Sequence, residues 1–236
     1  MKTYRMNAVM AGALYFLGTA FGVTGRLVGG DLFSVTAKPL AGVDILGLIA
    51  ANSSQLTWVA FLTLMMGISL TAMTVFLYPI FRKDSEELAV GMLLFRGALE
   101  GSYYIVTTLV LLTLITLSYE YTATGAASAA LQSMGNVLYQ FQDFIGPVGT
   151  MMFLIGAICL YVSFYRTRLI PRWLSIWGLI GVVPYIAYAL LHFFHMDNGI
   201  GFYLQMVLAP QELVMGAWLV IKGFNLDAVR KLDEVD

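Results

Sequence analysis

The sequence has little charge for its length. Only 11% of its 236 residues are charged and 59% are hydrophobic, whereas a soluble domain carries roughly 25% charged residues. So few charges cannot cover a surface that faces water, which excludes a soluble globular protein. The formal net charge of −1 also provides no electrostatic basis for binding nucleic acid.

Cysteine and the common catalytic motifs are scarce as well. Cys159 is the one cysteine, so the chain cannot form an intrachain disulfide. The sequence contains no glycine-rich phosphate loop, no serine nucleophile elbow and no paired-histidine motif of the zinc proteases. We therefore leave open whether the protein is an enzyme, favour a role without catalysis, and assign no cofactor.

Long hydrophobic stretches fill most of the chain. A helix needs about 20 apolar residues to cross the hydrocarbon core of a bilayer, and the hydropathy of the sequence predicts six such helices. The expected fold class is all-α: one integral membrane domain over residues 1–236, built as a single bundle. The predicted spans are residues 7–23, 56–81, 88–117, 137–165, 173–195 and 200–222.

Lysine and arginine are distributed unevenly between the two sides of this bundle. Ten of them lie on the side that carries both termini, and two, Arg26 and Lys38, lie on the other. The positive-inside rule then places both termini in the cytoplasm. On the opposite side, the composition predicts short helices at residues 39–51 and 126–134.

Three ionisable side chains fall in the middle of predicted spans. Arg96 and Glu100 are four residues apart in the third span, so they share a helix face. Glu212 lies in the sixth span, after Gln211. Counted from the cytoplasmic side at helical rise, Arg96 and Glu212 lie at similar depths, ~12 and ~15 Å. An Arg96–Glu212 ion pair is therefore expected, with Glu100 either sharing Arg96 or protonated.

Ionisable residues at this depth are costly and usually mark functional sites. We therefore take Arg96, Glu100, Gln211 and Glu212 as candidate ligand-binding residues, with a cavity expected to reach them. The alternative interpretation is a structural ion pair that fixes the register of the helices.

A second cluster of polar side chains is expected near the side of the membrane opposite both termini. Asp143 lies early in the fourth span, while His192 and His195 end the fifth, three residues apart on roughly one face. Imidazole and carboxylate groups are good zinc ligands, so these three residues are candidate metal ligands. Histidines at a helix end are also typical interface residues, and that interpretation stays open.

Several short motifs resemble a known family. They are Arg96-x3-Glu100, the Ile170-Pro171-Arg172-Trp173 turn, and Gln211-Glu212 followed by Trp218. The pattern is similar to that of a bacterial multi-pass membrane family known as the domain of unknown function 4386. The resemblance implies a prokaryotic cytoplasmic membrane and no established activity, and it covers most of the chain.

Three functions remain as hypotheses. The first is binding or transport of a small lipophilic or amphiphilic molecule, with its polar end near Arg96, Glu100 and Glu212. The second is an accessory or assembly subunit of a larger membrane complex. The third is a metal-dependent membrane hydrolase that uses Asp143, His192 and His195. The expected partners are the lipid bilayer and a lipid-like small molecule, and both a homo-oligomer and a larger complex stay open.

Overall fold

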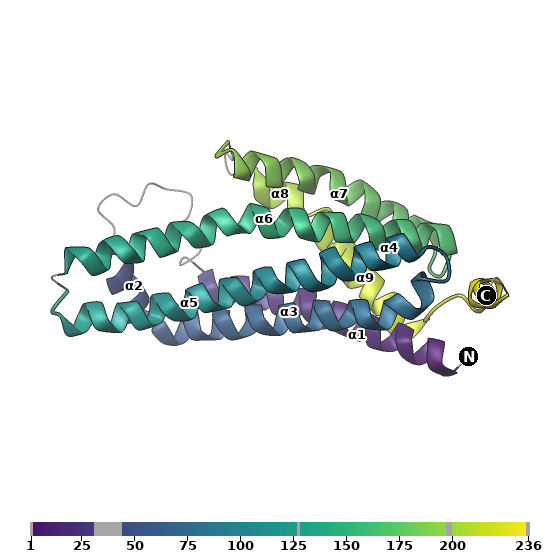
Figure 1. The fold of residues 1–236 in the computed structure, drawn as a ribbon, viewed down its shortest axis with the longest axis horizontal. Coiled ribbons are helices and arrows are strands. Elements are labelled where there is room, and N and C mark those ends of the chain that lie inside the picture. The colour runs from purple at the N-terminus through teal and green to yellow at the C-terminus, as the bar shows by residue number, and fades with distance from the viewer. Residues whose placement is uncertain (1, 31–43, 127, 197–199, 235–236) are drawn as a thin grey trace.

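The regular structure is helical throughout the part of the chain that the computed structural model describes, residues 2–30, 44–126, 128–196 and 200–234 (Figure 1). Six helices are long and apolar enough to cross a membrane, so the predicted all-α fold with six spans is confirmed. The helices are α1 (Lys2–Gly29), α2 (Ile45–Ala51), α3 (Ser53–Phe81), α4 (Glu86–Met92), the π-helical turn η3 (Leu93–Leu99), α5 (Glu100–Ala123), α6 (Ala129–Thr167), α7 (Arg172–Phe193), α8 (Gly201–Gln205), α9 (Leu208–Ile221) and α10 (Leu226–Asp233).

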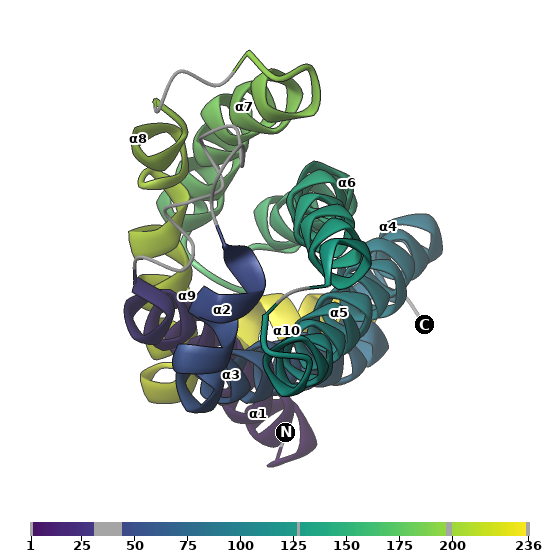
Figure 2. The same ribbon diagram turned by 90° about the vertical axis from the view of Figure 1, so that its left-hand side faces the viewer.

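The six long helices form a ring. α1 packs on α3, α3 on α5, α5 on α6, α6 on α7, and α7 on α9, which returns to α1. Figure 2 shows this arrangement from one end, with α2 close to the centre. α4, η3 and α5 follow one another without a break, so they form a single span, Glu86–Ala123. The ring gives the bundle an interior toward which polar side chains from several helices can point.

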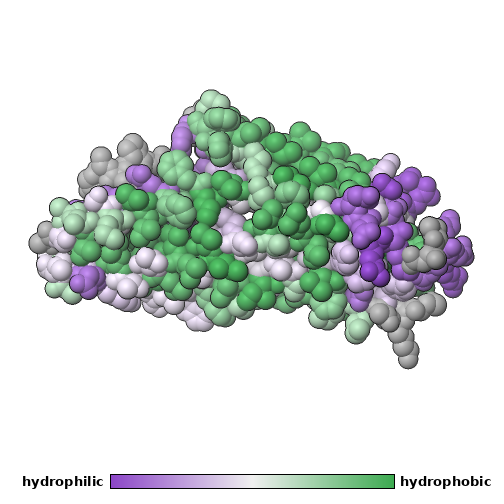
Figure 3. Space-filling model, in the orientation of Figure 1, coloured by the Kyte–Doolittle hydropathy of each residue, from purple (hydrophilic) through white to green (hydrophobic). Residues whose placement is uncertain are grey.

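Hydrophilic residues gather at one end of the bundle, which we call the basic end (Figure 3). Both described ends of the chain lie there (Figure 1). Its ion pairs include Lys83 with Asp233 at 3.0 Å and Arg166 with Asp84 at 2.9 Å. We call the opposite end, where α5 and α6 meet, the distal end.

The amphipathic helix α10 covers the basic end. Its Val229 side chain is buried, and the Asn225 amide donates a hydrogen bond to the carbonyl of Leu169 at 2.9 Å. The Asp233 carboxylate accepts hydrogen bonds from Tyr4 at 2.5 Å and from Lys83 at 3.0 Å. The bond from Tyr4, followed by that from Lys83, lowers the pKa of Asp233. These contacts tie α10 to α1 and to the turn between α3 and α4.

Two helices extend well past their predicted spans at the distal end. α6 has 39 residues, which is ~58 Å at helical rise and about twice the hydrocarbon thickness of a bilayer. The short helix predicted at residues 126–134 is therefore wrong, because Ala129–Met134 forms the first turns of α6. The helix predicted at 39–51 corresponds to α2, and residues 39–43 lie outside the described part.

The sixth span is interrupted, whereas the sequence predicted one helix over residues 200–222. α8 ends at Gln205 and α9 begins at Leu208. The physical reason is Pro210, which lacks an amide hydrogen and so cannot bond to the carbonyl four residues earlier. The indole of Trp177 donates a hydrogen bond to the Val207 carbonyl at 3.0 Å, which compensates one polar group at the break. The break lies just beyond Glu212 on its distal side.

Candidate functional site

The third span carries Arg96 on a π-helical turn. Turns of this kind are rare and occur frequently at functional sites. The turn packs closely against α6 at Gly156, where an added Cβ atom would lie 2.6 Å from the Arg96 Cβ. On the other side, the Thr71 hydroxyl of α3 donates to the Gly97 carbonyl at 3.0 Å. Contacts from two neighbouring helices therefore fix the position of Arg96.

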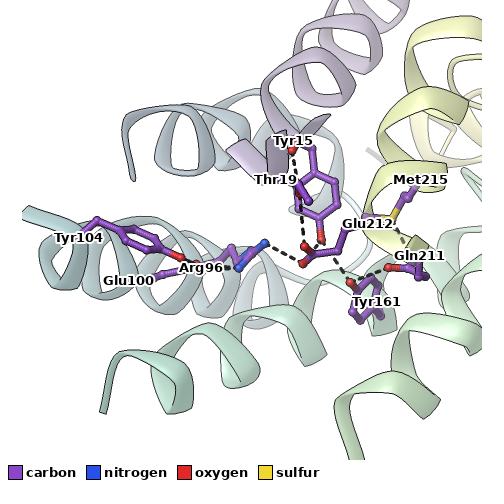
Figure 4. Close-up of polar contacts among 9 residues, drawn as sticks. All are labelled: Tyr15, Thr19, Arg96, Glu100, Tyr104, Tyr161, Gln211, Glu212 and Met215. Carbon is purple, nitrogen blue, oxygen red and sulfur yellow. Dashed lines mark hydrogen bonds and ion pairs between the residues drawn. The ribbon is translucent and has the colours of Figure 1, made fainter. Parts of the chain in front are cut away.

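The guanidinium of Arg96 binds two carboxylates (Figure 4). Its Nη1 donates to both oxygens of Glu100 at 2.8 Å, and its Nη2 donates to Oε1 of Glu212 at 3.2 Å. The ring of Phe153 lies 4.3 Å from the guanidinium carbon, a cation–π distance. The predicted Arg96–Glu212 pair is thus present, and Glu100 shares the same arginine.

Hydroxyl groups complete the carboxylate contacts. Tyr104 donates to Glu100 at 3.0 Å, and Tyr15 of α1 donates to Oε1 of Glu212 at 2.9 Å. Thr19, one turn along α1 from Tyr15, lies 3.4 Å from Oε2 of Glu212. α1, α5 and α9 therefore meet at this cluster together with the π-helical turn.

A second chain of hydrogen bonds continues toward α6 and α7 (Figure 4). The hydroxyls of Tyr15 and Tyr161 lie 3.2 Å apart, and Tyr161 donates to Oε1 of Gln211 at 2.9 Å. The amide nitrogen of Gln211 donates to the Leu174 carbonyl at 3.0 Å. Gln211 is therefore fully engaged in positioning Tyr161 against the cluster.

Burial is uneven across these residues. Arg96 is 2% exposed and Gln211 is 0% exposed, while the Glu100 side chain is 1% exposed and that of Glu212 is 14% exposed. Water can therefore reach the Glu212 side chain, whereas the other three side chains are almost inaccessible. Of the four predicted ligand-binding residues, Glu212 alone has an appreciable accessible surface.

The basic half of the ring is closed below this cluster. Leu77, Phe81, Phe164 and Leu169 are each completely buried there, and α10 covers that end. On the distal side a second buried cluster joins α2 to α3, α5 and α6, with Ile45, Ile49, Leu111 and Leu114 among its members. Between the two buried regions, Thr19, Tyr103 and Tyr185 are only half-buried.

Gly146 of α6 shows that there is space on the distal side. It lies seven residues from both Tyr139 and Phe153, so the three share one face of the helix. Tyr139 and Phe153 are buried on that face, yet a Cβ added at Gly146 would meet no atom within 4 Å. The face of α6 that carries Phe153 therefore borders open space at Gly146, seven residues farther toward the distal end.

The structure brings together part of the second predicted group, the candidate metal ligands Asp143, His192 and His195. His192 Nε2 lies 3.3 Å from Oδ1 of Asp143, and the Tyr188 hydroxyl lies 3.3 Å from His192 Nδ1. His195 instead packs edge-on against the ring of Phe144, with centroids 5.0 Å apart. α7 ends at Phe193 and His195 has φ 55°, which directs it away from the helical face. Within the described residues, no three metal-ligating side chains cluster.

Tyr15, Thr19, Tyr104 and Tyr161 are members of the cluster that the sequence did not identify. A tyrosine or threonine in an apolar span is ordinary, so residue type alone gives no signal. Depth could have identified Tyr15, which lies ten residues beyond Arg5 at the start of the first span and therefore near the level of Glu212.

The chain matches one family model. The family is described as a domain of unknown function (DUF4386), and the match covers residues 10–223. No curated protein and no solved structure matches the chain.

The close approach at Gly156 gives a first prediction. We expect Gly156→Ala to displace the π-helical turn and to lower the free energy of unfolding by about 1–3 kcal/mol, the usual cost of overpacking. The measurement is thermal unfolding of the purified protein in mild detergent. Gly146→Ala on the same helix is the matched control and should leave the melting temperature unchanged or raise it, because its methyl group meets open space. Equal destabilisation by both variants would contradict the proposed packing.

The buried ion pair gives a second prediction. Arg96→Met should cost about 3–5 kcal/mol, because it leaves carboxylates buried without their partner. The double variant Arg96→Met/Glu100→Leu should be closer to the wild type, because an apolar replacement of a whole buried pair is often nearly neutral. The measurement is the free energy of unfolding of both variants. The control is Arg82→Met, which replaces an exposed arginine at the basic end. Additive losses in the double variant would show that the pair is not coupled.

Proposed function

The chain belongs to the DUF4386 family, whose description assigns no activity, and we propose that it binds a small lipophilic or amphiphilic molecule in the distal half of the helix ring. The polar end of this molecule would lie against Glu212. The observation that carries the proposal is the uneven burial of the cluster: Glu212 is partly accessible, while Arg96 and Glu100 are almost completely buried.

A purely structural role would not require this arrangement. Both oxygens of Glu100 already accept from Nη1 of Arg96, and Tyr104 supplies one further bond to Glu100. Adding a second carboxylate to one guanidinium leaves a negative charge in excess, which is costly inside a membrane. Because Glu212 adds that cost and is also partly accessible, its role is better explained by contact with a ligand than by helix register.

The surroundings of Glu212 suit an amphiphile. We propose that Thr19, Tyr103, Gly146, Tyr185 and Glu212 border one space, which we call the distal vestibule. Its base carries the carboxylate, the Thr19 hydroxyl and the Tyr185 hydroxyl, which donates to Gln205 at 3.3 Å. Its walls carry aromatic rings, including that of Phe153, which lies 5.3 Å from the Tyr185 ring. Binding sites for small molecules combine a few polar groups with mostly apolar walls in this way.

In this proposal, the distribution of basic residues decides to which side of the membrane the vestibule opens. The loops at the basic end hold most of the lysine and arginine residues, so the positive-inside rule places this end and both termini in the cytoplasm. The distal vestibule then opens away from the cytoplasm. The resemblance to a bacterial family supports a prokaryotic cytoplasmic membrane as the location.

One observation favours an accessory subunit as a second candidate function. Near the distal end, α5 and α6 expose large apolar side chains beyond the ends of their predicted spans. These side chains are Tyr119 and Met134. Such a surface fits a contact with another membrane protein, and it would act independently of the vestibule.

Native mass spectrometry of protein extracted in mild detergent tests the proposed function. We expect a retained non-protein mass on the wild type that is lost in Gly146→Leu, because the added side chain extends into the proposed vestibule from a position where its Cβ atom meets no neighbour. Ala130→Leu is the matched control, since it places the same side chain on an exposed position of the same helix and should retain the mass.

Two results would count against vestibule binding. One is a bare wild-type protein across several mild detergents, and the other is an adduct that Gly146→Leu retains. A stable complex with a second polypeptide in either case would instead support the accessory-subunit function.

A further inference from the structure

We propose that the distal vestibule selects an amphiphile whose polar end is a cation able to donate a hydrogen bond, such as a primary or secondary ammonium group. This inference rests on the proposed binding function and adds the chemical class of the ligand. It follows from the charge of the cluster, from the hydrogen bonds that Glu212 lacks, and from the aromatic rings nearby.

The cluster contains one more acidic side chain than basic side chains. One guanidinium, Arg96, faces the two carboxylates of Glu100 and Glu212. With all three groups ionised, one negative charge remains without a counter-charge within the cluster. An anionic ligand would add to this excess, whereas a cation would balance it.

The excess charge is concentrated on Glu212. Both oxygens of Glu100 lie 2.8 Å from the same Arg96 nitrogen, and Oε1 also accepts from Tyr104. Glu212 receives a longer bond of 3.2 Å from Arg96, together with the bond from Tyr15, and both go to Oε1. The hydrogen bonds from the buried side of the cluster therefore leave Oε2 of Glu212 largely uncompensated.

Thr19 compensates Oε2 weakly. Its hydroxyl lies 3.4 Å from Oε2 of Glu212 and 3.2 Å from the backbone carbonyl of Tyr15. A hydroxyl has one hydrogen to donate, so it cannot serve both acceptors at once. An ionised carboxylate oxygen can accept about two hydrogen bonds. Oε2 therefore keeps capacity for a donor that arrives from the accessible side.

Aromatic rings favour a cation over a neutral donor at this position. Arg96 already uses the faces of Phe153 and Tyr15, with centroid distances of 4.3 and 5.4 Å. Next to them, the Tyr185 ring lies 5.3 Å from that of Phe153, and aromatic rings attract organic cations, whereas the Tyr103 ring packs against Gly149 of α6. The open space beside Gly146 can take the apolar part of the ligand.

A series of eight-carbon probes of different charge tests the inference: octylammonium, octanol and octanoate. Binding to the protein in lipid nanodiscs is measured by ligand-observed NMR. We expect octylammonium to bind the wild type about tenfold more tightly than octanol, with octanoate the weakest. Glu212→Gln should remove the preference for octylammonium, while Glu120→Gln, an exposed carboxylate at the end of α5, should keep it.

A second variant tests the role of the Glu212 carboxylate if the Glu212→Gln protein fails to fold. Glu212→Asp keeps the carboxylate on a shorter side chain, and it should retain the preference for octylammonium with a weaker affinity. Loss of that preference in a folded Glu212→Asp protein, judged by its melting temperature, would overturn the assignment to Glu212.

The outcomes separate this inference from the proposed function. Equal or tighter binding of octanol or octanoate, blocked by Gly146→Leu, would overturn the cationic class and leave the binding function standing. Binding of none of the three probes, or binding that Gly146→Leu does not affect, would overturn both.

Discussion

The ionised guanidinium of Arg96 lies near the middle of an apolar bundle, and much of the surrounding structure serves to compensate it. A charge at this depth costs about 2.5–3.5 kcal/mol on insertion scales. Both oxygens of Glu100 accept from one Arg96 nitrogen, Glu212 supplies a second carboxylate, and Phe153 an aromatic face. These partners come from α5, α9 and α6, so three helices meet at one side chain.

The local irregularities of the bundle lie close to the polar cluster. The π-helical turn and the close contact at Gly156 bring Arg96 against α6. The break before α9, for which Pro210 is the physical reason, lies next to the helical segment that carries Glu212.

Depth and helical spacing made part of this site predictable from the sequence. The i,i+4 spacing placed Glu100 beside Arg96, and matched distances from the basic end placed Glu212 opposite. Spacing failed where the helix ended: His192 and His195 share a face only while the helix continues, and α7 stops at Phe193. The six spans were predictable because burial in lipid requires long apolar segments.

Other features depend on packing between distant segments and could not be predicted. Depth alone could indicate Tyr15, but its contact with Tyr161 exists because α1 and α6 bring the two hydroxyls to 3.2 Å, which neither sequence neighbourhood indicates. Gly156 and Gly146 are ten residues apart on one helix, yet one touches Arg96 and the other borders open space. The distal ends of α5 and α6 were predicted too short, because a hydropathy window stops where polar residues begin, although the helix continues.

We propose that the Arg96 cluster is closed toward the basic end and is reached from the distal end. Cysteine accessibility at Thr19, next to Glu212, tests this most directly. In a Cys159→Ser background, Thr19→Cys should react with a membrane-impermeant cationic thiol reagent applied from the distal face only. Ala11→Cys, completely buried two turns nearer the basic end on the same helix, should stay unreactive. Protection of Thr19→Cys from both faces, or labelling from the basic end, would contradict the account.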